Sequence, residues 1–409
     1  MGVPQAANAT ATTHGIAQFA PLPEGERSGI GLCLSGGGYR AALFHLGVLR
    51  RLNELGILPQ VTTISSVSGG SIISAFLATK IAWPLSAPVA DWEGTVSTPF
   101  RNFTSTNIRT GALLKSLLPW VSAVDALASK YEDGLTQLKL AEIPPKPTFI
   151  FCATDLGFGV NWTFGKSHIG DYQAGYVAPT PPTWPLSLAV AASSCFPPVF
   201  NPLPVRLKPS QFSPGKFPVG RKRDSILSAM RLSDGGVYDN LGLEPVWRTH
   251  KVVLSSDGGA LFDPGVEKNI FRWVKGYVAI PENQALAVRK RWLISNFLTG
   301  ILRGTYCGIG GLATNYGNPT ATGYGSDLVE NFIAKIRTDL DRFSDAEARI
   351  LENHGYCLAD AAAQRHVPNL ISSGALTFAV PHPNWMNESA AKKALENSWK
   401  RTLLGRGWG

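Results

Sequence analysis

The sequence predicts an α/β protein whose strands run parallel. Three observations carry this prediction: an apolar run at residues 30–35, a helical repeat of leucines directly after it, and a β-branched run at residues 60–67. Short apolar runs bounded by glycine are typical of buried strands, and apolar residues three or four positions apart are typical of a helix. Two strands joined by one helix form a crossover unit, which places its strands parallel.

The first predicted strand reads IGLCLS, and a helix follows it. The repeat that indicates this helix consists of Leu43, Leu46, Leu49, Leu52 and Leu55. Gly56 follows the last of these leucines, at a position where helices commonly end. The segment QVTTISSV is predicted as the second strand because β-branched residues favour strands, and GGSIISAFLATK directly after it predicts a second helix.

The later part of the chain fits the same class. Further predicted elements are a helix near 121–142, a strand at 147–155, a helix at 185–200 broken by Pro197 and Pro198, a strand at 251–259, and a largely helical stretch at 327–365. Ser344 and Glu347 have the spacing of a capping box, which opens a helix in the last of these stretches. We therefore assign the whole chain to the α/β class.

Composition and charge restrict the possible partners. The formal net charge is +9, which suits nucleic acid or an anionic membrane. The basic residues are dispersed and accompany no nucleic-acid-binding motif, so we expect no nucleic-acid partner. Five scattered cysteines indicate free thiols in a reducing compartment. The sequence has neither a signal-peptide pattern nor the roughly 18 to 20 consecutive apolar residues of a membrane span, so we expect a soluble, cytoplasmic protein.

The junction TISSVSGGSI is the sharpest chemical feature. Ser68 stands between a predicted strand and a predicted helix, and Gly69 and Gly70 follow it. A nucleophile elbow needs small neighbours around the serine, although Ser66 stands where the pattern G-x-S-x-G has its first glycine. The helix N-terminus behind Ser68 would stabilise a developing negative charge. We therefore take Ser68 as a candidate nucleophile.

A serine nucleophile needs a base, and the sequence offers two kinds. None of the seven histidines stands in the strand-end loop typical of a triad base; His45 lies inside the first helix, and His354 lies near a helix end. Two Asp-Gly-Gly stretches place Asp234 and Asp257 in loops whose glycines permit close approach to Ser68. A partly buried aspartate can accept a serine proton. The pattern alone does not choose between these two aspartates.

The glycine triplet in SGGGYRA suggests a site for an anion. Gly36, Gly38 and Ala41 formally satisfy the dinucleotide fingerprint, but the acidic residue that would hold a ribose is missing after the second strand. A phosphate-binding P-loop is excluded because no Gly-Lys-Ser/Thr follows. The remaining use for these backbone amides is an oxyanion hole, in which one donor is worth about 3 to 4 kcal/mol.

Four segments together resemble the patatin-like phospholipase family. GGGYRA is similar to its glycine-rich oxyanion motif, SVSGG to its nucleophile elbow, PLSLAVAASSCFPPVF to its small-residue helix, and LSDGGVYDNLGLEP to its aspartate loop. The resemblance covers about residues 28–260. It implies a three-layer α/β/α fold with a central, mostly parallel sheet. The chain would then consist of an extended tail (1–27), a catalytic core (28–265), a mainly helical part packed on the core (266–380) and a basic tail (381–409).

The resemblance also implies the roles of site residues. Ser68 is implied as the nucleophile and Asp234 as its only base, so that Asp257 becomes structural. The implied oxyanion hole consists of backbone amides of Gly36, Gly37, Gly38 and Gly69, and Arg40 is expected to support this loop. The implied reaction is hydrolysis of a phospholipid or lysophospholipid ester through an acyl-enzyme, without a metal or cofactor.

Two alternatives stay open beside this reading. The same site would serve a neutral-lipid or short-chain ester hydrolase, and a catalytically silent lipid-binding protein would keep the same fold. Residues 271–303 are basic and aromatic, and we expect them either to contact an anionic membrane surface or to pack on the core as a helix. The residues that suggest membrane contact are Trp273, Lys275, Arg289, Lys290, Arg291, Trp292, Phe297, Leu298 and Arg303.

Overall fold

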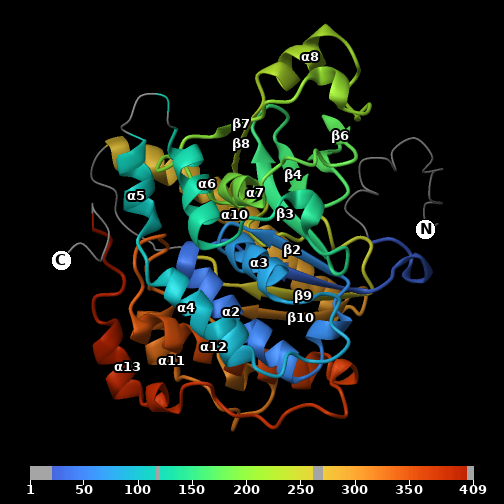
Figure 1. Cartoon of the computed structure of the whole chain (residues 1–409). Coiled ribbons are helices and arrows are strands. Elements are labelled where there is room, and N and C mark those ends of the chain that lie inside the picture. Colours follow the sequence, from blue (N-terminus) through green and yellow to red (C-terminus); the bar gives the residue numbers. More distant parts are fainter. Residues whose placement is uncertain (1–20, 117–119, 121, 261–269, 403–409) are drawn as a thin grey trace, which may run out of the picture.

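A ten-stranded mixed sheet runs through the centre of the computed structural model (Figure 1). The structure describes residues 21–116, 120, 122–260 and 270–402, and within 270–298 it describes the side chains of residue 280 and of residues 283 onward. The strands are β1 (Ile30–Leu34), β2 (Thr63–Val67), β3 (Thr148–Asp155), β4 (Val160–Phe164), β5 (Ile169–Asp171), β6 (Gly175–Val177), β7 (Leu203–Pro204), β8 (Arg231–Asp234), β9 (Val252–Asp257) and β10 (Arg303–Gly308).

The strand order is β10-β9-β1-β2-β3-β4-β5-β6. Neighbours from β10 to β3 are parallel, whereas β4, β5 and β6 extend the sheet in antiparallel fashion. Strand β8 also pairs with β3, and β7 pairs with β8, both antiparallel. The carboxyl ends of β1, β2 and β3 therefore lie side by side, which is where parallel sheets gather functional residues.

Helices follow the strands along the chain. They are α2 (Gly38–Glu54), α3 (Gly69–Lys80), α4 (Thr98–Thr104), α5 (Ile108–Lys115), α6 (Ala123–Gly134), α7 (Leu186–Ser194), α8 (Arg221–Ser228), α9 (Gly236–Asp239), α10 (Ile270–Leu298), α11 (Ser326–Leu328), α12 (Asp345–His366) and α13 (Glu388–Leu395). Among the described residues, no helix is both long and apolar enough to cross a membrane.

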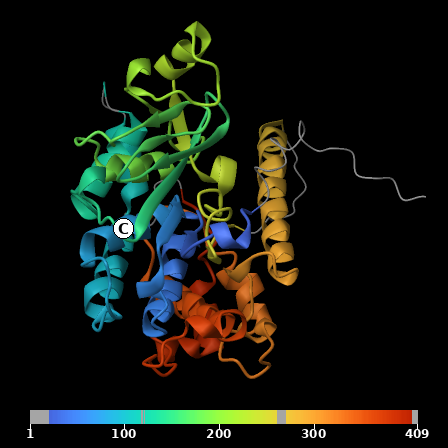
Figure 2. The same cartoon turned by 90° about the vertical axis from the view of Figure 1, so that its right-hand side faces the viewer.

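The two faces of the sheet are covered by different helices. Successive residues of a strand point to opposite faces, so Leu32 and Leu34 of β1 join the larger core, to which α2, α3 and α12 contribute. Cys33 points the other way and packs in a smaller core with Val246 and Leu293, the latter from α10. Figure 2 shows α10 standing on the side away from α2. The predicted three-layer α/β/α class is confirmed.

The predicted elements near the amino terminus agree closely with the structure. Strand β1, helix α2, strand β2 and helix α3 occupy the expected residues, and the capping box of Ser344 and Glu347 opens α12. The sequence did not predict β4 to β6, β8 or β10. These strands have three to six residues each, and several contain glycine. Only β4, VNWTF, alternates between apolar and polar residues, and it does so over five residues.

Helix α12 packs directly on α2 because glycines face each other where the helices cross. A Cβ added to Gly47 of α2 would lie 2.7 Å from the carbonyl carbon of Glu352, so no side chain fits there.

The carboxylate of Glu352 is fully buried and accepts hydrogen bonds from Arg101 (2.5 Å), Ser97 (2.7 Å) and His382 (2.8 Å). Burial would raise the pKa of Glu352, but the hydrogen bond from His382 and the charge of Arg101 outweigh it and lower the pKa to about 2.

Replacement of Glu352 by glutamine is expected to lower the free energy of unfolding by about 3 to 5 kcal/mol at pH 7, because it removes the fully buried partner of the Arg101 ion pair. The folded-state pKa lies below the ordinary value of 4.5, so the carboxylate stabilises the fold above that value and loses this contribution as pH falls toward 2. The difference in the free energy of unfolding between variant and wild type, measured by urea unfolding, should therefore become smaller as the pH falls. An equal loss in Glu330→Gln, at an exposed position, would contradict this account.

Candidate active site

Ser68 occupies the sharp turn between β2 and α3. Its backbone angles are φ 49° and ψ −114°, a region that strains every residue except glycine. Such strain costs about 1 to 3 kcal/mol and is common at functional sites. A Cβ added to Gly70 would lie 2.7 Å from the carbonyl carbon of Leu34, so the turn also requires a small residue here. A serine in this position has the geometry that a nucleophile elbow needs.

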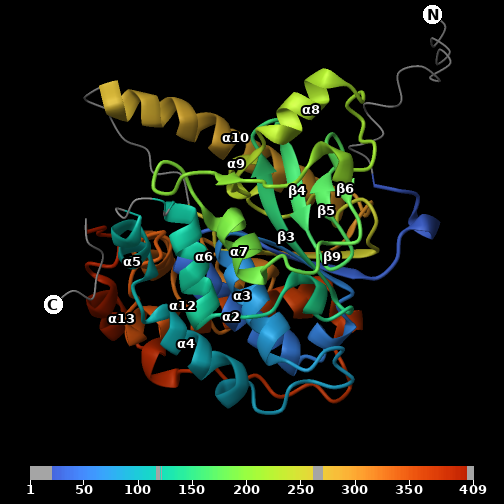
Figure 3. The same cartoon turned by 45° about the horizontal axis from the view of Figure 1, so that its top comes forward.

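Ser193, at the end of α7, holds the backbone of this turn. Its hydroxyl accepts a hydrogen bond from the Ser68 amide at 2.9 Å and donates to the carbonyl of Cys152 at 2.6 Å. Its own carbonyl accepts from the amide of Gly235 at 3.2 Å. Helix α7 lies between α6 and β3 (Figure 3). These hydrogen bonds place Ser193, near the end of α7, at the serine turn. No motif in the sequence predicts this role for Ser193, whose one signal is its place in a run of small residues.

Strand β3 places Asp234 beside the serine turn. Strand β2 pairs with β3 up to Val67 and Cys152, and β8 pairs with β3 from Asp155 to Ala153, where Asp234 ends the strand. Because β4 occupies the opposite edge of β3 along this stretch, β2 and β8 share one edge and end head to head. Ser68 follows Val67 directly, so the two predicted residues meet at this junction.

Asn240 fills the space between the serine, the aspartate and the glycine loop. A Cβ added to Gly36 would lie 3.1 Å from the Cβ of Ser68 and 3.4 Å from the Cγ of Asn240. A Cβ added to Gly236 would lie 2.7 Å from the Oδ1 of Asn240 and 3.0 Å from the Oδ1 of Asp234. Asp234 is buried, and its Oδ1 accepts a hydrogen bond from the amide of Gly236 at 2.7 Å. These five residues form one compact cluster.

The glycine loop presents backbone amides beside Ser68. The Gly36 amide donates to the carbonyl of Asn240 at 3.0 Å, so it holds the loop. Gly37 and Gly38 have φ values of 138° and 59°, which favour glycine. Among the described residues, no hydrogen-bond acceptor is paired with the amides of Gly37, Gly38 or Gly69. A Cβ added to Gly69 would lie 3.0 Å from the nitrogen of Gly38, so the N-termini of α2 and α3 converge here.

Arg40 lies beneath this loop and is almost fully buried. Its Nε and Nη2 donate to the carbonyl of Gly258 at 3.2 and 3.1 Å, and its Nη1 donates to the carbonyl of Ile336 at 2.8 Å. Burial lowers the pKa of Arg40 to about 10, against the opposing charge of Asp257, so the guanidinium stays protonated at neutral pH. Arg40 therefore acts on the loop through Gly258 and through a later segment of the chain.

The histidines of the described part form no hydrogen bond with Ser68 or Asp234. His45 is buried in α2, donates from Nε2 to the carbonyl of Ser35 (2.9 Å), and accepts at Nδ1 from the hydroxyl of Ser256 (2.7 Å). Burial lowers its pKa to about 4, so it is neutral at pH 7. His354 contacts the carbonyl of Ile309 (2.7 Å). Both histidines are structural, and His14 lies outside the described residues.

Asp257, the alternative base, is held at the end of β9. Its carboxylate forms an ion pair with Lys290 of α10 at 2.5 Å and accepts hydrogen bonds from Tyr306 (2.6 Å) and the amide of Gly259 (2.9 Å). Burial would raise its pKa, but the charge of Lys290 outweighs this effect and keeps the pKa below the ordinary value. A carboxylate so bound is a poor proton acceptor, and its contacts are those of a structural anchor.

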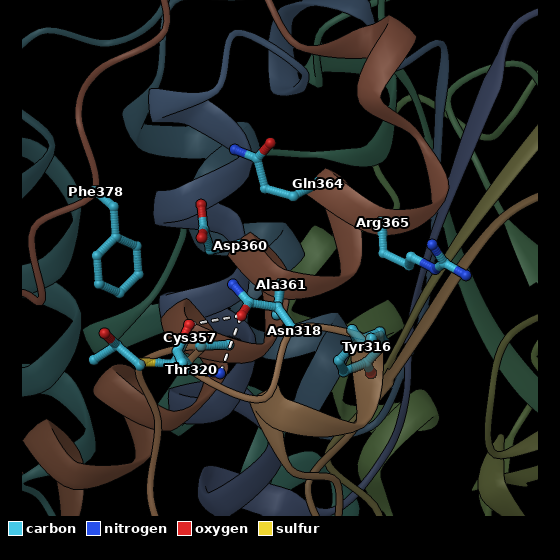
Figure 4. Close-up of a pocket in the computed structure, with 12 residues that line it drawn as sticks. Tyr316, Asn318, Thr320, Cys357, Asp360, Ala361, Gln364, Arg365 and Phe378 are labelled. Atoms are coloured by element: carbon cyan, nitrogen blue, oxygen red, sulfur yellow. Dashed lines mark hydrogen bonds between the residues drawn. The ribbon is translucent and has the colours of Figure 1, made fainter.

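A separate cavity of about 370 Å³ lies between α12 and residues 316–322 (Figure 4). Asp360 and Arg365 are among the side chains that line it, and none of the predicted site residues does. Within the described ranges, no group of three or more histidine, cysteine, aspartate or glutamate side chains could hold a metal ion.

The comparisons with known proteins identify the family. Residues 32–247 match the family model of patatin-like phospholipases. This segment is more than half of the 409 residues, so the chain belongs to the patatin-like phospholipase family. Membership supports lipid acyl hydrolase chemistry in general.

The solved structures that resemble this chain share little sequence identity with it. Human GIVD cytosolic phospholipase A2 in complex with methyl γ-linolenyl fluorophosphonate is 14% identical, with a TM-score of 0.47 over 91% of this chain and 60% of that one. Human GIVD cytosolic phospholipase A2 in another structure is 18% identical, with a TM-score of 0.40 over 61% of this chain and 48% of that one. VipD from Legionella pneumophila is 15% identical, with a TM-score of 0.32 over 90% of this chain and 74% of that one.

The chain thus spans less than two thirds of the cytosolic phospholipase A2 chains that it resembles. No curated protein matches the chain.

Proposed function

We propose that the chain is a lipid acyl hydrolase of the phospholipase A or lysophospholipase type, with Ser68 as nucleophile and Asp234 as base. The observation that carries the proposal is the head-to-head ending of β2 and β8 on β3, which brings these residues together beside the glycine loop. Membership in the patatin-like phospholipase family supports a lipid ester as the substrate.

The reaction would proceed in two acyl transfers. Asp234 accepts the hydroxyl proton of Ser68 while the Ser68 oxygen forms a bond to the ester carbonyl carbon. The oxyanion that results is held by the amides of Gly37, Gly38 and Gly69, and its collapse breaks the bond to the alcohol, which takes the proton from Asp234. Water then gives a proton to Asp234 and attacks the acyl-enzyme, and Ser68 regains its proton as the fatty acid leaves.

A substrate panel tests the proposal. Purified chain is incubated with phosphatidylcholine, lysophosphatidylcholine, triacylglycerol and a p-nitrophenyl ester, and the fatty acid released is measured by mass spectrometry. We expect the fastest release from the phospholipid or lysophospholipid. Preferential release from triacylglycerol or the short ester would favour the alternative hydrolases. No release from any ester, together with no labelling of Ser68 by a fluorophosphonate, would indicate a silent lipid-binding protein.

We further propose that α10 contacts an anionic lipid surface. Trp292 packs edge-on against Trp247 with ring centroids 4.6 Å apart, and Arg289 pairs with Asp239, so these side chains face the protein. Val288, Arg291, Ile294 and Leu298 are exposed, and at 100° per residue they share one side of the helix. Trp273 and Lys275 have side chains outside the described residues. The exposed side of α10 combines apolar side chains with positive charge, which suits an anionic membrane.

The double variant Val288→Glu, Leu298→Glu should reduce binding to phosphatidylserine-containing vesicles at least about tenfold, because it removes apolar insertion and adds repulsive charge. Binding is measured by vesicle sedimentation at low and high salt. Hydrolysis of a soluble p-nitrophenyl ester should stay unchanged. Leu376→Glu, at an exposed position outside α10, serves as the control. Equal vesicle binding by the double variant and the control would exclude α10 as the contact.

A further inference from the structure

We propose that residues 334–343, here called the strap, position the oxyanion loop from outside the family-matched segment. The strap leads into α12 and lies far along the chain from residues 32–247. It touches the loop at Gly38 and Tyr39, next to the amides proposed as oxyanion donors. The inference rests on the proposed function, since it assigns these contacts a role in that reaction.

The backbone of the strap is in direct contact with the glycine loop. The amide of Tyr39 donates to the carbonyl of Asp339 at 2.9 Å. A Cβ added to Gly38 would lie 2.6 Å from the same carbonyl oxygen and 3.1 Å from the nitrogen of Asp339. The strap thus occupies the space that a side chain at residue 38 would need. It also uses the amide of Tyr39, which leaves the amides of Gly37 and Gly38 for the oxyanion.

Arg40 connects the strap with the opposite side of the loop. Its guanidinium donates to Ile336 and Ala334 of the strap at 2.8 and 3.4 Å, and to the carbonyl of Gly258. That carbonyl oxygen lies 2.8 Å from the position of a Cβ added to Gly37. The loop is therefore enclosed between Gly258 on one side and the strap on the other. Arg40 holds both sides at a fixed separation.

The strap is itself anchored to the core by an ion pair. The Oδ2 of Asp339 pairs with Arg109 of α5 at 2.5 Å, and its Oδ1 accepts from the amide of Leu340 at 2.7 Å. The carbonyl of Leu340 accepts from the amides of Ile108 and Arg109, both at 3.2 Å. Only 4% of the Asp339 side chain and 12% of the Arg109 side chain are exposed, so the pair is largely shielded from solvent.

A buried arginine also holds the strap, through residues on both sides of Asp339 and through α12. Arg337 forms ion pairs with Asp341 and Glu347 at 2.8 and 2.6 Å, and its guanidinium lies 4.2 Å from the ring centroid of Phe343. The ring of Phe343 in turn packs edge-on against Tyr39 at 6.0 Å. Because these contacts flank Asp339, its carbonyl stands in a defined place against Gly38. Displacement of a catalytic group by about 1 Å can cost about 100-fold in rate, so the fixed position of this carbonyl against the loop matters for catalysis.

The test compares Asp339→Ala with Asp360→Ala in the full-length protein. Asp360 is a matched control because it also pairs with a core arginine, Arg51 of α2, at 2.8 Å, but lies in α12 and not in the strap. For each variant kcat and KM are measured on a soluble ester below the unfolding temperature, and the thermal midpoint is recorded. We expect Asp339→Ala to lower kcat by about 10- to 100-fold with KM within about twofold, because an oxyanion contact is made only in the transition state.

The outcomes separate the strap from the proposed function. Asp339→Asn, which keeps a hydrogen-bonding side chain, should restore most of the lost kcat, and Asp360→Ala should lower the thermal midpoint alone. Unchanged kcat in Asp339→Ala, or an equal fall in Asp360→Ala, would overturn the strap while the proposed function stands. If Asp339→Ala does not fold, Asp339→Ser, which also removes the ion pair with Arg109, takes its place, and an unchanged kcat in Asp339→Ser overturns the strap. Activity that persists in Ser68→Ala would overturn both proposals.

Discussion

Replacement of Ser68 by alanine is expected to reduce kcat for ester hydrolysis on the order of 10⁶-fold, the loss seen when serine hydrolases are deprived of their nucleophile. Alanine removes only the hydroxyl, and the turn is held by the amide of residue 68, which bonds to Ser193 and remains in the variant. The fold should therefore persist. Fatty acid release and labelling by a fluorophosphonate are measured together with the thermal midpoint.

Ser74→Ala provides the matched control for this experiment. Ser74 is a fully buried serine on the same helix, α3, and no role in the chemistry is assigned to it. Its replacement should leave kcat and labelling close to wild type. Residual activity of Ser68→Ala above about one part in a hundred of wild type would show that another residue is the nucleophile.

Replacement of Asp234 by asparagine is expected to lower kcat by about 10²- to 10⁴-fold, the usual contribution of a general base. Asparagine matches the aspartate in shape, and its amide oxygen can still accept from the amide of Gly236. The loss should therefore fall on kcat, measured with a soluble ester, more than on the thermal midpoint.

Asp257→Asn separates the two Asp-Gly-Gly stretches that the sequence left as alternatives. Asp257 is engaged by Lys290 and Tyr306, so its replacement should cost stability and retain most of the activity. The opposite pattern, with activity lost in Asp257→Asn and kept in Asp234→Asn, would reverse the assignment of the base.

Local signals in the sequence predicted the elements that carry Ser68 and the glycine loop. Strand β1 and helix α3 are largely apolar runs, α2 has a helical repeat of leucines, and β2 is rich in β-branched residues. Small residues stand at their junctions, and all these signals depend on neighbouring residues only. The order of the chain also favoured a parallel centre for the sheet, because helices join its successive strands.

Local signals of this kind do not predict contacts between residues that lie far apart in the sequence. The meeting of Ser68 with Asp234 depends on β8, a strand of four residues that pairs with β3 across a gap of more than seventy residues. The Gly36 amide was assigned a place in the oxyanion hole, yet it donates to Asn240, a bond no motif indicates. The contact of Asp339 with Gly38 joins residues about three hundred positions apart. Pairing and packing of this kind are set by the tertiary structure.

Strand β3 sets the distance between the proposed nucleophile and the proposed base. Because β2 and β8 end against its adjacent residues Cys152 and Ala153, the spacing of nucleophile and base is set by one peptide unit. The loops within 81–147 and 156–230 can change in length during evolution without altering that spacing, provided that α7 keeps Ser193 at the serine turn. A single residue inserted between Cys152 and Ala153 would instead move the two side chains apart and out of phase. Tolerance to insertion in this chain should therefore be least in the middle of β3.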